Sequence, residues 1–156
     1  MRSAAAAPGV PIAEIETPRS IPISSPAIPS PTSTLPPAPP DALCPEWWAV
    51  ARAEGWEEEH LGSLDLALWR ESRCDPEQHN GSDPGSGSYG LLQINSFWCE
   101  PSRYWPDGYL QAHGILGSCS DLYRPETALR AGLTIYRYAE ENSACGWEPW
   151  ATMTCP

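Results

Sequence analysis

The stretch Trp69–Cys99, WRESRCDPEQHNGSDPGSGSYGLLQINSFWC, changes character twice along its length. It starts as the end of an apolar, helix-like segment, continues as a run of Gly, Ser, Asp and Asn that favours turns, and ends in an apolar run typical of a strand. One carboxylate, Glu71, stands at the boundary between the helix and the turn. This pattern predicts a small hairpin sheet attached to a helix.

Three segments around this stretch have helical periodicity. Pro45–Gly55 (PEWWAVARAEG) has proline in its first turn and glycine at its end. Ser63–Ser72 (SLDLALWRES) predicts a second helix with Ser63 as its N-cap. Arg124–Glu141 (RPETALRAGLTIYRYAEE) predicts a third, longer helix with one apolar stripe. The expected fold class is therefore α+β, mainly α.

Composition divides the chain into two parts. Residues 1–40 hold eleven of the 19 prolines and no aromatic residue or cysteine. Such a segment has too few large apolar groups to form a core, so we expect a Pro-rich disordered arm or linker. Residues 41–156 contain all 8 tryptophans and are long enough for one core, which predicts a single domain.

The charge balance argues against nucleic acid as a partner. The chain has 9 Lys plus Arg, all of them arginine, against 20 Asp plus Glu, for a net charge of −11. Binding to phosphates requires clustered cations, which are absent from the sequence. The acidic run EGWEEEH at 54–60 is most simply a solvated face. No apolar run approaches eighteen residues, so we expect no membrane span.

The six cysteines all lie in the predicted domain, at 44, 74, 99, 119, 145 and 155. An even number in a small domain favours three disulfides and an oxidising compartment. No CxxC pair, HExxH motif or Cys/His grouping has ligand spacing, so we expect neither a metal nor a cofactor. We expect a secreted or cell-wall-associated protein, although MRSAAAAPGVPIAEIE is not a recognisable export signal. Either the start is truncated, or export follows another route, such as release with a phage particle or on host lysis.

Glu71 lies on the apolar face of its predicted helix. At 100° per residue it projects within about 20° of Leu64 and about 40° of Ala67. Partial desolvation there raises the pKa of a carboxyl group, which can then act as a general acid. From position alone, a surface or ion-paired glutamate beside Arg70 and Arg73 is the simpler interpretation.

The wider motif favours catalysis. WRES, the turn-rich loop and SYGLLQINSFWC, in this order, resemble the lysozyme-like superfamily of C-type lysozymes, goose-type lysozymes and soluble lytic transglycosylases. The resemblance is best over residues 69–99 and looser from Cys44 to Cys155. It implies a lysozyme-like fold with a helical body, a small β-hairpin wing and a cleft for peptidoglycan glycan strands. We expect such a protein to act as a monomer.

The resemblance also implies roles for individual residues. Glu71 matches the acid that protonates the glycosidic oxygen between N-acetylmuramic acid and N-acetylglucosamine. Trp98 is expected to stack on a sugar, whereas Trp147 and Trp150 are expected in the core. Gly90 and Gln93 match the motif that lines the cleft in this superfamily. The structural alternatives are a strand bend at Gly90 and an exposed strand position for Gln93. The full set of expected substrate-binding residues is Ser88, Tyr89, Gly90, Gln93, Asn95 and Trp98.

Ser88 departs from the C-type lysozyme pattern. Those enzymes have a second carboxylate seventeen residues after the acid, where this chain has Ser88. Its absence favours a lytic transglycosylase, in which the 6-hydroxyl of the muramic acid attacks and Glu71 acts as acid and then as base. Asp83 is the candidate second carboxylate for a hydrolase, with turn formation as its simpler role. A non-catalytic glycan-binding or structural module is the third interpretation.

We further predict a disulfide pattern, chosen among the fifteen pairings that six cysteines allow. One bridge joins the ends of the domain, one closes the loop after the strand, and one fixes the catalytic helix to the terminal GWEPW segment. The predicted pairs are Cys44–Cys155, Cys99–Cys119 and Cys74–Cys145.

Overall fold

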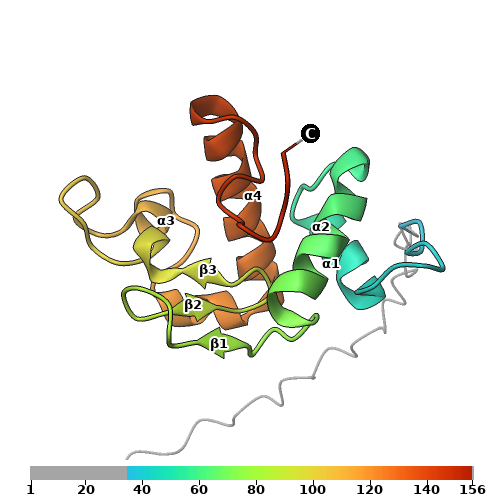
Figure 1. Cartoon of the computed structure of the whole chain (residues 1–156), viewed down its shortest axis with the longest axis horizontal. Coiled ribbons are helices and arrows are strands. Elements are labelled where there is room, and N and C mark those ends of the chain that lie inside the picture. The colour runs from blue at the N-terminus through green and yellow to red at the C-terminus, as the bar shows by residue number, and fades with distance from the viewer. Residues whose placement is uncertain (1–34, 156) are drawn as a thin grey trace, which may run out of the picture. The chain divides into compact units, whose positions relative to one another are not determined.

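The computed structural model describes residues 35–155, which pack as one unit of helices with a small antiparallel sheet at one side (Figure 1). This confirms the mainly helical α+β class. The predicted arm spans residues 1–40, and its residues 1–34 lie outside the described part of the chain. Among the helices of residues 35–155, none has the length and apolar character needed to cross a bilayer.

Two of the three predicted helices are confirmed with small changes. The first is divided between a 3-10 helix, η1 (Pro45–Trp47), and α1 (Trp48–Ala53). Gly55 follows α1 with a positive φ of 97°, which glycine adopts without strain. The third is α4 (Pro125–Asn142), where proline occupies the first turn because its missing N–H would have no helical partner there.

The second predicted helix begins earlier than its sequence pattern suggested. Helix α2 spans Glu58–Ser72, so Ser63 lies inside it and the prediction of Ser63 as N-cap is wrong. Glu57 occupies the N-cap position with extended backbone, and the next two glutamates form the first turn. Negative charge at this end is favourable because the helix dipole is positive there. Leu61, in the part of α2 that precedes Ser63, is buried in the core.

The sheet consists of β1 (His79–Asn80), β2 (Ser88–Tyr89) and β3 (Ile94–Asn95), paired antiparallel in that order. The run 89–95 is therefore not the single strand that its apolar character predicted. A tight turn, Gly90–Gln93, separates β2 from β3, and both of its ends have positive φ. The two leucines inside the turn are completely buried, which explains why the run reads as a strand.

This turn attaches the sheet to the helical body. The indole Nε1 of Trp150 donates a hydrogen bond to the carbonyl oxygen of Leu92 at 2.8 Å. Leu92 also packs over Gly132 of α4, where a Cβ would lie only 2.3 Å from the leucine Cδ1. At its other end, the turn brings Gly90 against the Leu122 carbonyl. The sheet is thus held to α4 and the C-terminal segment together.

The chain between the sheet and α4 contains only short helices. These are η2 (Ser96–Trp98), α3 (Tyr109–Ala112) and η3 (Cys119–Tyr123). The Cys99–Cys119 disulfide closes this segment, with 5.3 Å between the Cα atoms. This pair is confirmed, because the chain returns to the end of η2 after α3.

The other two predicted disulfide pairs are wrong. The structure joins Cys44 to Cys74 and Cys145 to Cys155, with Cα separations of 5.6 and 5.7 Å. The carboxylate of Asp65, in the middle of α2, accepts hydrogen bonds from the backbone N–H groups of Leu43 and Cys44. The indole Nε1 of Trp47 donates to the Cys74 carbonyl at 3.0 Å, so this segment lies along α2 as far as Cys74. The C-terminal segment returns through successive turns to its own start, which brings Cys155 to Cys145.

We expect Gly90→Ala to lower the free energy of unfolding by roughly 2–4 kcal/mol, because the methyl group meets the Leu122 carbonyl oxygen at 2.1 Å and φ is +69°. Gly62→Ala is the matched control: nothing lies within 4 Å of its Cβ, so replacing a helical glycine should stabilise by about 0.5–1 kcal/mol. Urea unfolding measures both. An unchanged midpoint for Gly90→Ala would show that the turn does not anchor the sheet.

A peptide map of the unreduced, oxidised protein should contain three linked pairs, Cys44–Cys74, Cys99–Cys119 and Cys145–Cys155, and no free thiol. Replacing the Cys44–Cys74 pair by serines should cost roughly 3–4 kcal/mol on the loop-entropy estimate for this separation of 30 residues. A peptide linking Cys44 to Cys155 would instead support the pairing predicted from the sequence.

Candidate active site

A cleft of about 340 Å³ opens between the end of α2, the sheet, α4 and the C-terminal segment. Five of the residues expected to act on a substrate, together with Asp83, line it. The lining residues are Glu71, Asn80, Asp83, Pro84, Ser88, Gln93, Ile94, Asn95, Trp98, Ile135, Pro149, Trp150, Ala151 and Thr152.

Glu71 enters the cleft from the last turn of α2 and is half-buried. Desolvation raises its pKa above the ordinary value of 4.5, and the negative charge of Asp83 raises it further. Thr152 acts in the opposite direction, because its hydroxyl donates a hydrogen bond to Glu71 Oε1. Burial is the largest of these effects, as the position of Glu71 on the apolar helix face indicated.

Asp83 belongs to the turn-rich loop between β1 and β2, and it faces the same cleft. Both carboxylate oxygens accept hydrogen bonds: Oδ1 from Asn80 Nδ2 at 2.9 Å and Oδ2 from Ser88 Oγ at 2.6 Å. The loop thus does not leave this side chain free to rotate. Two acidic side chains line the cleft, and none of the lining residues within 35–155 is basic.

Ser88 and Asn95 extend this hydrogen-bonded network across the sheet. Ser88 is buried in β2 and directly opposes Asn95 in β3. Asn95 Nδ2 donates to Ser88 Oγ at 3.3 Å and to the Pro84 carbonyl at 3.0 Å. The chain Asn95–Ser88–Asp83 therefore connects the rigid part of the sheet to the carboxylate in the loop.

The remaining expected residues fall into two groups. Gln93 lines the cleft, and its Nε2 donates to the carbonyls of Gln78 and Gly90, both at 3.0 Å. Tyr89 and Gly90 do not line it. The ring of Tyr89 stacks on His79 with centroids 4.6 Å apart, and Gly90 packs against η3 through the Leu122 carbonyl.

A second hollow, the aromatic groove, has a volume of about 580 Å³ and adjoins the cleft at Trp98, which lines both. Its walls include strongly exposed rings, among them Phe97 at 67% and Tyr104 at 69%. Trp98 meets Tyr138 of α4 edge to face at 5.6 Å. The complete lining is Phe97, Trp98, Ser102, Tyr104, Trp105, Tyr109 and Tyr138.

Sequence reasoning missed the contribution of the C-terminal segment. Trp147 and Trp150 are buried, as expected for core residues, but Trp150 also forms part of the cleft wall. Thr152, which contacts Glu71, lies 81 positions away in the sequence. The sequence signal for this arrangement was the short spacing of the last two cysteines. A bridge between them folds the C-terminal segment into a short closed loop.

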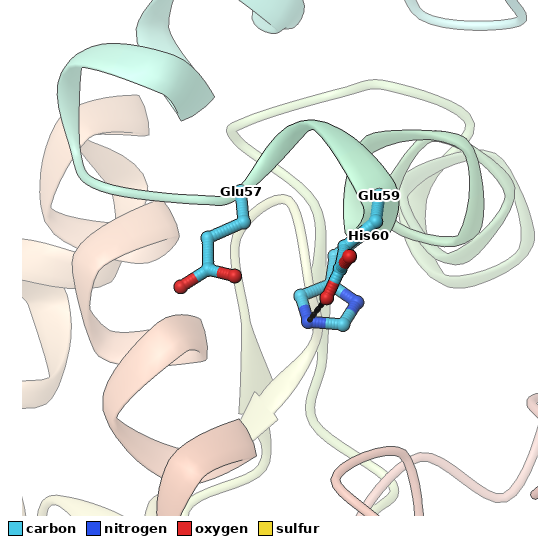
Figure 2. Close-up of side chains that lie close together, drawn as sticks. All are labelled: Glu57, Glu59 and His60. Carbon is cyan, nitrogen blue, oxygen red and sulfur yellow. Dashed lines mark ion pairs between the residues drawn. The ribbon is translucent and has the colours of Figure 1, made fainter.

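A further group of possible ligands lies at the start of α2, away from the cleft. Figure 2 shows Glu57, Glu59 and His60, whose ligand atoms all lie within 4.8 Å of one another. Glu59 pairs with His60 Nε2 at 3.6 Å. Carboxylates in a first helical turn are also favoured by the helix dipole, which accounts for the two glutamates without an ion.

No match to this chain is found among the models of known protein families, the curated proteins or the solved structures.

The raised pKa of Glu71 predicts a pH-dependent effect of Glu71→Gln on stability. A carboxyl whose pKa is higher in the folded state stabilises the fold when protonated, and this contribution is lost as pH rises through the folded-state pKa. At pH 7 the glutamine variant should therefore melt at a higher temperature than the unaltered protein. The difference should vanish below about pH 3, where the glutamate is protonated in both the folded and the unfolded state.

Glu77→Gln is the matched control, because Glu77 is an exposed glutamate outside the cleft. It should leave the melting temperature nearly unchanged at both pH values. A Glu71→Gln variant less stable than the unaltered protein at pH 7 would contradict the desolvation of this carboxyl.

Proposed function

We propose that this protein cleaves the β-1,4 glycosidic bond between N-acetylmuramic acid and N-acetylglucosamine in peptidoglycan, as a glycosidase with Glu71 as general acid. The observation that carries the proposal is the pair of carboxylates in one cleft. Asp83 is held by Ser88 and Asn80, and it lies close enough to Glu71 for its charge to raise the Glu71 pKa.

The two carboxylates suit the two tasks of glycoside cleavage. One acid must donate a proton to the leaving oxygen, and the raised pKa of Glu71 keeps it protonated at a higher pH than an exposed glutamate. A second group must act on the other face of the sugar, as base toward water or as nucleophile. We assign this task to Asp83, whose two oxygens are already oriented by donors.

This assignment favours hydrolysis over the transglycosylation that Ser88 suggested. A transglycosylase needs no second carboxylate, because the 6-hydroxyl of the substrate attacks. In this cleft, the hydroxyl of Ser88 donates a hydrogen bond to Asp83 at 2.6 Å. The serine therefore orients a carboxylate that comes from the neighbouring loop. The muramidase interpretation with Asp83 is therefore the better supported one.

The substrate class rests on the resemblance of residues 69–99 to the lysozyme-like superfamily and on the shape of the site. A small sheet beside a helical body, with a cleft lined by residues of both, supports this proposal. Trp98 joins the cleft to the aromatic groove, and aromatic rings pack against the apolar faces of sugars. A glycan longer than the cleft fits this continuous surface.

We infer that the protein works outside the reducing cytoplasm, at the cell wall. All six cysteines are paired in the structure, and disulfides persist in oxidising compartments. The net charge of −11 is unfavourable for binding to nucleic acid.

Digestion of purified peptidoglycan tests the proposal. Glu71→Gln should lower turnover by at least about a hundredfold, the scale for loss of a general acid, while Glu77→Gln should retain it. Mass spectrometry of the products should find reducing ends, and Asp83→Asn should abolish them. Dominant 1,6-anhydro ends that persist in Asp83→Asn would identify a lytic transglycosylase. Tight glycan binding without cleavage would identify a binding module.

A further inference from the structure

The segment after α4 forms a closed loop against the cleft. We call residues 145–155 the C-terminal strap. Its ends are joined by the Cys145–Cys155 disulfide, and successive turns at Trp147–Trp150 and Trp150–Met153 give it a compact backbone. In Figure 1 the strap is the red segment that returns from the end of α4 toward α2. Four consecutive strap residues, 149–152, line the cleft.

Two hydrogen bonds attach the strap to the last turn of α2. The hydroxyl of Thr152 donates to Glu71 Oε1, and the guanidinium Nη1 of Arg70 donates to the Thr152 carbonyl oxygen at 2.5 Å. These contacts involve consecutive residues of α2 and both the side chain and the backbone of one threonine. The bond from Arg70 therefore holds the backbone of Thr152 at the end of α2, within reach of the Glu71 carboxyl.

The contact has a defined chemical effect on the carboxyl of Glu71. A hydroxyl that donates to a carboxylate stabilises the ionised form, so Thr152 lowers the pKa that desolvation and Asp83 raise. It also fixes the orientation of the carboxyl group. The other cleft residues from the strap and from α4 carry no charge, and Glu148 of the strap instead accepts from the backbone N–H of Ala144.

We propose that Thr152 is a positioning residue for Glu71, and that the Cys145–Cys155 disulfide holds Thr152 in place by closing the strap. The inference rests on the proposed role of Glu71 only for its effect on turnover. The contact itself joins a C-terminal residue to the acid whether or not a glycan is cleaved.

Carbon-13 NMR titration of the Glu71 carboxyl in the full chain tests the contact without substrate. The resonance is assigned by its loss in Glu71→Gln. Thr152→Val keeps the side-chain shape and removes the donor, so the pKa should rise; Thr152→Ser keeps a hydroxyl and should stay near the unaltered value. An unchanged pKa in Thr152→Val overturns the proposal. If the valine variant does not fold, Thr152→Ala is titrated by the same criterion.

Kinetics on peptidoglycan give a second readout. Loss of orientation should lower kcat about tenfold in Thr152→Val with little change in KM, since the threonine supports the acid and not the sugar. The alkaline limb of the pH profile should move to higher pH, because the acid stays protonated longer. A raised pKa in a protein that cleaves no glycan would leave the positioning role intact and remove the proposed function.

The disulfide is tested by the paired variant Cys145→Ser/Cys155→Ser. It should raise the Glu71 pKa in the same direction as Thr152→Val, and adding Thr152→Val to it should have little further effect. Cys99→Ser/Cys119→Ser is the matched control, because that bridge closes a loop of which no residue lines the cleft. If the Glu71 pKa in the variant without the Cys145–Cys155 bridge equals that of the unaltered protein, the proposed role of the disulfide is overturned.

Discussion

The hydrogen bond from the Trp150 indole to the Leu92 carbonyl fixes the position of almost everything else in the site. Leu92 is in the turn that joins β2 to β3, and its side chain fills the space left by Gly132 on α4. One residue of the turn between β2 and β3 is thereby bound to α4 and to the C-terminal segment. Because protein interiors tolerate few voids, this contact restricts the placement of the sheet relative to α4 and the C-terminal segment. The cleft exists because of that placement.

The uncharged Ser88 and the loop carboxylate Asp83 are best understood as one unit. The serine hydroxyl lies 2.6 Å from the Asp83 oxygen, so a carboxylate in place of Ser88 would face Asp83 at the same range. Two ionised carboxylates at that distance repel each other strongly, and one would retain its proton. The negative charge can therefore come from the strand or from the loop, but not from both. In this chain the carboxylate belongs to the loop, and hydrogen bonds from Asn80 and Ser88 hold Asp83 against the sheet.

The sequence predicts features that depend on local chemistry. Pro125 and the apolar stripe behind it identified α4, and the helical position of Glu71 indicated a desolvated acid. Features that depend on long-range contacts were not predictable. The start of α2 is set by burial of Leu61 and not by the serine that resembled a cap. The Cys44 pairing depends on Asp65, whose carboxylate accepts hydrogen bonds from two backbone amides of the N-terminal segment, and no local pattern encodes that contact.

The three bridges follow one another along the chain without overlap: 44 with 74, then 99 with 119, then 145 with 155. The first cysteine of each pair thus finds its partner in the next cysteine to emerge when the polypeptide is made or threaded from its N-terminus. An oxidant that joins thiols in their order of appearance would yield the native set directly, without exchange of mispaired bonds.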